Sequence, residues 1–165
     1  MNERDVESIV RNVLRELKPF ESANAEITMN LELAKKLIES VEVEAQKMGV
    51  KAVVAVSDAA GRPVAIHCMD GAYIGSFDVA LNKTYTSVAF QMSTAKLAKL
   101  AAPGGSLYGI QNTNEGKIVI FGGGEPLYIG DKLIGAIGVS GGTAEQDTRL
   151  GEFGKNRLKE VITWK

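Results

Sequence analysis

The residues best suited to holding a metal or prosthetic group are adjacent in the chain: His67 and Cys68. Haem iron takes His, Cys, Met or Tyr as axial ligand. Both residues lie in a predicted strand, where successive side chains point to opposite faces, so at most one can face a given pocket. The alternatives are a partly exposed strand histidine and a small buried cysteine. We predict both as cofactor-binding candidates and His67 as the metal ligand.

Four further residues are candidates for contacts with a cofactor. Tyr85 lies on a predicted helix and could ligate iron or contact a ring, although a buried tyrosine ordinarily packs and hydrogen-bonds its hydroxyl. Gly122, Gly123 and Gly124 form a permissive backbone at a strand end. Their amides could donate to a carboxylate or propionate. These residues complete the predicted cofactor site.

The sequence offers no catalytic motif, and we assign no catalytic residue from it. A single histidine excludes a histidine cluster and an HExxH metal site. Gly135, Gly138 and Gly141 are spaced by three within a predicted strand, which is neither a dinucleotide fingerprint nor a phosphate-binding loop. Such strand glycines indicate either a close approach of backbone across the sheet or the wall of a ligand site.

Composition narrows the class of protein. The 165 residues are 45% hydrophobic and 24% charged, with a net charge of −1, which is typical of a globular domain and gives no electrostatic reason to expect nucleic acid. No apolar run is long enough for a membrane span, and the charged N-terminus does not resemble a secretory signal. One cysteine excludes an internal disulfide. We expect a cytoplasmic protein with no membrane or nucleic-acid partner.

Residues 1–18 have the pattern of an amphipathic helix. Pro19 should end it, and residues 19–25 resemble a linker to a domain at 26–165. The helix either packs on its own domain or docks on a partner, and an isolated helix this short is marginal in water. Its apolar stripe follows the spacing i, i+3, i+4, i+7, i+8, i+11. The stripe consists of Val6, Ile9, Val10, Val13, Leu14 and Leu17.

The domain alternates helical and strand patterns. Hairpin-connected strands between helices predict an α+β fold, in which helices cover an antiparallel sheet. We expect Asn30 or Thr28 to cap the first helix of the domain and Thr143 with Gln146 to form a capping box. The predicted helices are 31–48, 76–90, 93–101 and 143–161, and the predicted strands are 50–57, 62–69, 117–121, 125–129 and 132–140.

These patterns carry a family resemblance. The segments VAVSDAAGRPVA (54–65), MDGA (69–72), ALNKTYTSVAF (80–90) and GGGEPLYIGDKLIGAIGVSGGTAEQD (122–147) resemble the GlcG/HbpS/PduO C-terminal-domain family, whose members are described as haem-binding or haem-degrading. The resemblance implies a profilin-like fold with a five-stranded antiparallel sheet flanked by helices. It also implies a homo-oligomer, often an octamer, and a haem or related tetrapyrrole ligand in some members.

The setting of the family agrees with the N-terminal segment. Copies of this domain occur with cobalamin adenosyltransferases in propanediol-utilisation microcompartments, and residues 1–18 resemble the encapsulation peptides of bacterial microcompartment cargo. We therefore expect an accessory protein of the microcompartment lumen that binds haem or a corrinoid and contacts shell protein or cargo through residues 1–18. The alternatives are an enzyme acting on a small aldehyde, a 2-hydroxy acid or haem, and a structural cargo oligomer without ligand.

Overall fold

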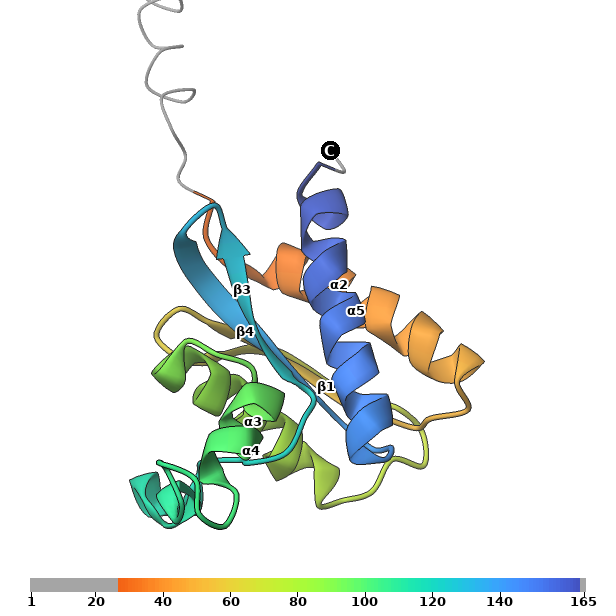
Figure 1. Cartoon of the computed structure of the whole chain (residues 1–165). Coiled ribbons are helices and arrows are strands. Elements are labelled where there is room, and N and C mark those ends of the chain that lie inside the picture. Colours follow the sequence, from red (N-terminus) through yellow and green to blue (C-terminus); the bar gives the residue numbers. More distant parts are fainter. Residues whose placement is uncertain (1–26, 164–165) are drawn as a thin grey trace, which may run out of the picture.

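A computed structural model describes residues 27–163, so the predicted N-terminal helix and its linker lie outside the described residues. A four-stranded antiparallel sheet lies between two layers of helices (Figure 1). The strand order is β2-β1-β4-β3. The strands are β1 (Val53–Asp58), β2 (Pro63–Cys68), β3 (Gly124–Ile129) and β4 (Lys132–Ser140), and the helices are α2 (Leu31–Lys47), α3 (Ser76–Phe90), α4 (Thr94–Ala101) and α5 (Ala144–Thr163).

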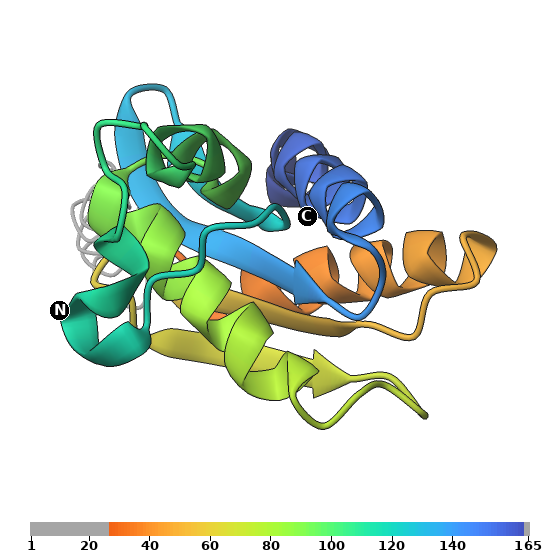
Figure 2. The ribbon, with the colours of Figure 1, turned by 60° about the horizontal axis from the view of Figure 1, so that its bottom comes forward.

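The two central strands explain the core. β1 and β4 are almost wholly buried, as their nearly continuous apolar runs predict for strands covered on both faces. Helices α2 and α5 pack together on one face, and α3 crosses the other (Figure 2). The largest apolar cluster fills the space between the sheet and the first pair of helices. It includes Leu37, Ile38, Val41, Val54, Val56, Ile137 and Leu150.

Helix ends follow the predicted capping chemistry. The side chain of Asn30 accepts a hydrogen bond from the amide of Leu33 at 2.9 Å, as expected for an N-cap. The predicted capping box is also present, because Gln146 N donates to Thr143 Oγ1 while Thr143 N donates to Gln146 Oε1. These local contacts fix where α2 and α5 begin.

The predicted α+β class is confirmed, but the prediction of five strands is wrong for the described residues. The segment 117–121 belongs to no ladder, because its backbone groups bind a side chain of α3. The amide of Val119 donates to Thr86 Oγ1 at 3.0 Å, and this hydroxyl donates to the carbonyl of Lys117 at 3.3 Å. A single threonine thus takes the place of a neighbouring strand. The profilin-like fold stays a prediction.

Within residues 27–163 no helix is both long and apolar enough to cross a bilayer. Two short 3₁₀ turns, η1 (Ile110–Asn112) and η2 (Asn114–Gly116), fill the loop between α4 and β3. That loop lies beside α3, where it contributes contacts to the site described below.

Candidate functional site

His67 lies on the edge strand β2 and contacts a carboxylate from α2. Its Nδ1 is 3.0 Å from Oε1 of Glu42, and both side chains are partly buried, with 33% and 23% exposed. When Nδ1 carries the proton and donates to Glu42, the Nε2 lone pair remains for another partner. Nε2 has no hydrogen bond among residues 27–163. This carboxylate–histidine arrangement is the one that commonly orients a metal-binding imidazole.

Cys68 ends β2 and is exposed, so the interpretation as a buried hydrophobe is wrong. The strand register supports the prediction that the two neighbours face opposite sides. Val54, opposite His67, packs in the core beneath α2, whereas Val53, opposite Cys68, packs with Ala80 of α3. Cys68 also lines an open groove of about 560 Å³ with Glu42. No group of three or more metal-ligating residues occurs in the described part of the chain.

A buried ion pair lies on the other side of the sheet. Lys83 of α3 is fully buried, and its ammonium donates to the Val139 carbonyl at 2.6 Å and to Oδ2 of Asp147 at 2.8 Å. The ring of Phe121 lies 4.9 Å from the ammonium, at cation–π distance. The other oxygen of Asp147 accepts from the amide of Gly142. Lys83 therefore ties together α3, β4 and the start of α5.

Burial and charge act in opposite directions on this lysine. Removal of water lowers the pKa of Lys83 below its ordinary value, and the carboxylate of Asp147 partly restores it. Unpaired, such an ammonium would be strongly destabilising in the core. Lys83 is 0% exposed, and its two hydrogen bonds join α3 to β4 and α5 in the described arrangement.

The glycine run Gly122–Gly124 packs directly over this ion pair. A Cβ atom on Gly123 would lie 2.8 Å from Lys83 Nζ, and one on Gly122 would lie 1.7 Å from Oγ1 of Thr148. Gly123 also has a φ of +114°, which disfavours any side chain. The amide of Gly124 is already bonded to Thr94 Oγ1. These contacts account for the glycines by close packing, and the predicted contact with a cofactor stays a prediction.

Gly135 and Gly138 of β4, and Gly141 directly after it, have the first of the two roles proposed from sequence. Added Cβ atoms would come within 2.0–2.4 Å of a carbonyl oxygen at each position. The oxygens belong to Ser57 opposite Gly135, Ala80 opposite Gly138 and Lys51 opposite Gly141. The close-approach interpretation is therefore confirmed.

Tyr85 lies on α3, apart from both His67 and Lys83 in its contacts. Its hydroxyl accepts a hydrogen bond from Nδ2 of Asn114 at 3.0 Å, and its ring lies beside Gly61 in the β1–β2 turn. The predicted site residues thus divide between β2, the outer part of α3 and the glycine run over Lys83. The structure does not gather them into one pocket within a single chain.

Sequence reasoning missed the partners that define these places. Glu42 lies 25 residues before His67, and Asp147 lies 64 residues after Lys83, so neither pair has a local spacing. One signal existed. Lys83 shares the stripe of Ala80, Thr84 and Ser87, which face the sheet, and a lysine at such a position requires a buried acceptor.

The comparisons with known proteins identify the family. Residues 29–154 match the family model described as "Haem degrading protein HbpS-like". The chain therefore belongs to the HbpS-like family.

Two curated proteins are similar to this chain in sequence. The chain is 45% identical over 134 residues to an uncharacterised 15.0 kDa protein of the dhaT-dhaS intergenic region of Citrobacter freundii, covering 81% of this chain and 94% of that protein. It is 31% identical over 150 residues to the corrinoid adenosyltransferase PduO of Salmonella typhimurium, covering 86% of this chain. The chain spans only 45% of that PduO.

Two solved structures agree with the fold. The ORFY protein of Klebsiella pneumoniae superposes with a TM-score of 0.78 at 36% identity, covering 84% of this chain and 95% of ORFY. PduOC, solved as a haem complex, superposes with a TM-score of 0.75 at 32% identity, covering 79% of this chain and 94% of PduOC. Haem binding is thus observed in a structural relative.

Proposed function

We propose that this chain is a tetrapyrrole-binding accessory protein that handles haem or a corrinoid in a bacterial microcompartment of the diol- or ethanolamine-utilising type. The observation that carries the proposal is the likeness to PduOC, which was solved with haem bound. The similarity to PduO, a corrinoid adenosyltransferase, supports a corrinoid as the alternative tetrapyrrole. The homologue of the dhaT-dhaS region supports no particular ligand.

The surroundings of His67 suit an imidazole that binds the metal of a tetrapyrrole through Nε2. Glu42 accepts from Nδ1 and so holds the tautomer in which Nε2 can bind iron or cobalt. A bound haem would supply an iron centre whose chemistry depends on this ligand. Cys68 lies next to His67 at the end of the same strand, where its thiol is exposed.

A single chain leaves this position open to solvent. Strand β2 is an edge strand, and all of its residues are partly or fully exposed. A porphyrin has two broad apolar faces, so a site here requires a second copy to cover the face turned away from His67. This requirement supports the homo-oligomer, with an octamer as the form that the family resemblance implies.

The test is an absorbance titration of the purified protein with haem and, separately, with cobalamin. We expect a saturable spectral shift that His67→Ala abolishes. Glu42→Gln should bind about 10-fold or more weakly, because loss of a metal ligand's outer partner typically costs that much. Asp131→Asn, an exposed change in the turn between β3 and β4, is the control and should titrate like the parent protein. Unchanged binding by His67→Ala would refute His67 as the ligand.

The same titration separates the alternatives. The family description as haem-degrading supports an enzyme that turns haem over, which would appear as a progressive loss of the haem spectrum after binding. A structural cargo oligomer would give no shift with either tetrapyrrole. Turnover of a small aldehyde or 2-hydroxy acid would require a separate assay with those substrates.

A further inference from the structure

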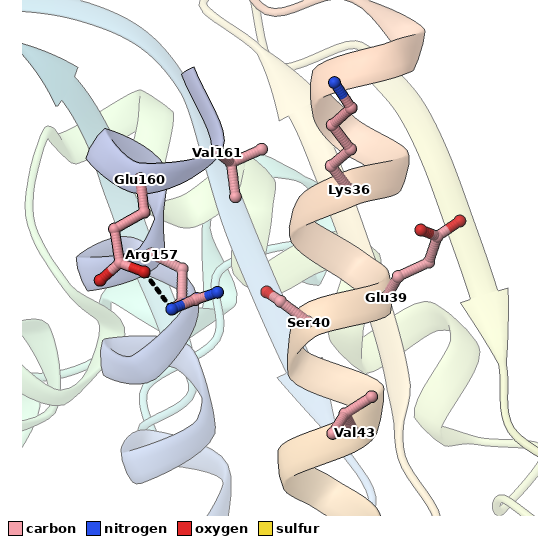
Figure 3. Close-up of a pocket in the computed structure, with 7 residues that line it drawn as sticks. All are labelled: Lys36, Glu39, Ser40, Val43, Arg157, Glu160 and Val161. Atoms are coloured by element: carbon pink, nitrogen blue, oxygen red, sulfur yellow. Dashed lines mark hydrogen bonds and ion pairs between the residues drawn. The ribbon is translucent and has the colours of Figure 1, made fainter. Parts of the chain in front are cut away.

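An apolar groove runs between α2 and α5 on the outer surface of the helical layer. Its volume is about 240 Å³, and most of its wall is hydrocarbon. In Figure 3, Ser40 of α2 and Arg157 of α5 extend toward each other across it. Val43 is 52% exposed at one end of this groove. The lining residues are Lys36, Glu39, Ser40, Val43, Arg157, Glu160 and Val161.

The groove continues along α2 toward the N-terminal end of that helix. A second hollow is lined by Leu31 and Lys35 and shares Lys36 and Glu39 with the first. Leu31, the first residue of α2, is 58% exposed. We call the surface from Leu31 to Val43 the α2 groove. At 1.5 Å per residue it is about 18 Å long.

Residues 1–18 match this surface in length and reach. The apolar stripe from Val6 to Leu17 would span about 17 Å as a helix. The intervening residues 19–26 can extend about 26 Å, enough to bring the segment back beside α2. Because α2 begins at Leu31, connectivity favours an antiparallel arrangement in which Leu17 lies near Leu31 and Val6 near Val43.

The groove carries charges of both signs, with Lys35, Lys36 and Arg157 beside Glu32, Glu39 and Glu160. The choice of occupant therefore rests on length and reach. Arg157 pairs with Glu160 through Nη1, while its buried Nε has no hydrogen-bond partner in the described part of the chain. A carboxylate on a covering helix would give this donor an acceptor.

We propose that residues 1–18 dock in the α2 groove of their own chain, so that the apolar stripe is covered until a partner displaces it. Docking in cis gives a short helix the apolar surface that it needs in order to form. A partner then has to compete with the groove, which makes exposure of the stripe an equilibrium between two bound states. This inference does not depend on the identity of the tetrapyrrole.

Disulfide trapping in the full-length protein tests both the contact and its direction. In a Cys68→Ser background, Val6→Cys combined with Val43→Cys should oxidise to an internal disulfide, seen as faster migration on a non-reducing gel. Val6→Cys combined with Leu31→Cys is the matched control. It should not close, because Leu31 lies at the opposite end of the groove and a disulfide needs its Cα atoms within about 7 Å.

Isotope labelling separates docking in cis from exchange between copies. Oxidation of an equal mixture of ¹⁴N- and ¹⁵N-labelled double variants should give only species of uniform label by mass spectrometry. Disulfides that join the two labels would show that the groove belongs to a second copy and would overturn the proposal. Equal closure of the Val43 and Leu31 pairs, or closure of neither, would also overturn it.

Discussion

The Lys83–Asp147 pair is the residue-scale contact on which three elements depend. Asp147→Asn should lower the free energy of unfolding by about 3–5 kcal/mol, because it leaves a buried ammonium without its counter-charge. The measurement is the urea midpoint at neutral pH. Glu152→Gln, an exposed change on the same helix, is the control and should stay within about 0.5 kcal/mol of the parent. An unchanged midpoint for Asp147→Asn would show that the ammonium does not depend on this carboxylate.

Glu125 gives the chain a pH dependence of known sign. Burial in β3 raises the pKa of Glu125 above 4.5, although Lys155, 2.9 Å away, opposes the shift. Between 4.5 and the raised value the folded state binds more protons than the unfolded state, so the free energy of unfolding falls as pH rises through this window. Glu125→Gln cannot titrate. The variant should gain stability relative to the parent as pH rises from 4.5, and then level off.

Urea midpoints of both proteins between pH 4 and 7 measure this difference. Lys155 is 46% exposed, so water can solvate it once its partner is gone. A constant difference between Glu125→Gln and the parent across this range would contradict the assignment of the slope to Glu125.

At the scale of elements, α3 packs closely against β4 because Gly138 has no side chain. A Cβ atom on Gly138 would lie 2.2 Å from the Ala80 carbonyl, so Gly138→Ala must push α3 away from the sheet. We expect a loss of about 1–3 kcal/mol by overpacking, measured as a lower melting temperature. Gly75→Ala is the matched control, because Gly75 has open space and an ordinary helical backbone. Equal melting temperatures for the two variants would refute this account.

The elements also show what sequence can predict. The helices, both hairpins and the caps at Asn30 and Thr143 depend on local periodicity and local hydrogen bonds, and these were predicted with nearly their observed bounds. The prediction of a fifth strand at 117–121 is wrong because the backbone of this segment bonds to the side chain of Thr86, which is distant in sequence. The same limit applies to the site. His67 was identified by its chemistry, whereas its pairing with Glu42 depends on tertiary structure.

At the scale of the whole molecule, one surface is unusually apolar for an isolated chain. Tyr73, Ile74 and Phe77, at the entry to α3, are 75%, 95% and 43% exposed. Such a cluster is typical of an interface, in agreement with the proposed homo-oligomer. Ile74→Glu should therefore shift the protein to smaller species in light scattering after size exclusion. Ser106→Glu adds the same charge to another exposed loop and should leave the mass unchanged. An unchanged mass for Ile74→Glu would exclude this surface from the interface.

The proposed targeting to a microcompartment concerns the whole molecule, because it requires that residues 1–18 bind a partner independently of the domain. A fusion of residues 1–25 to a fluorescent protein should form foci in cells that express a matching shell, and diffuse fluorescence in cells that do not. Leu14→Glu places a charge in the apolar stripe and should disperse the foci. Arg11→Glu, off the stripe on the same helix, is the control and should retain them.

The same two substitutions in the full-length protein show whether residues 1–18 are a separable targeting helix or a part of the folded domain. If the helix is separable, Leu14→Glu changes delivery while the cooperative urea transition of the domain persists, with at most a small shift from lost docking in the α2 groove. If Leu14→Glu instead abolishes that transition, residues 1–18 are part of the folded core and the targeting function fails. The domain observed at residues 27–163 has its own closed apolar cluster, which is the physical reason to expect the first result.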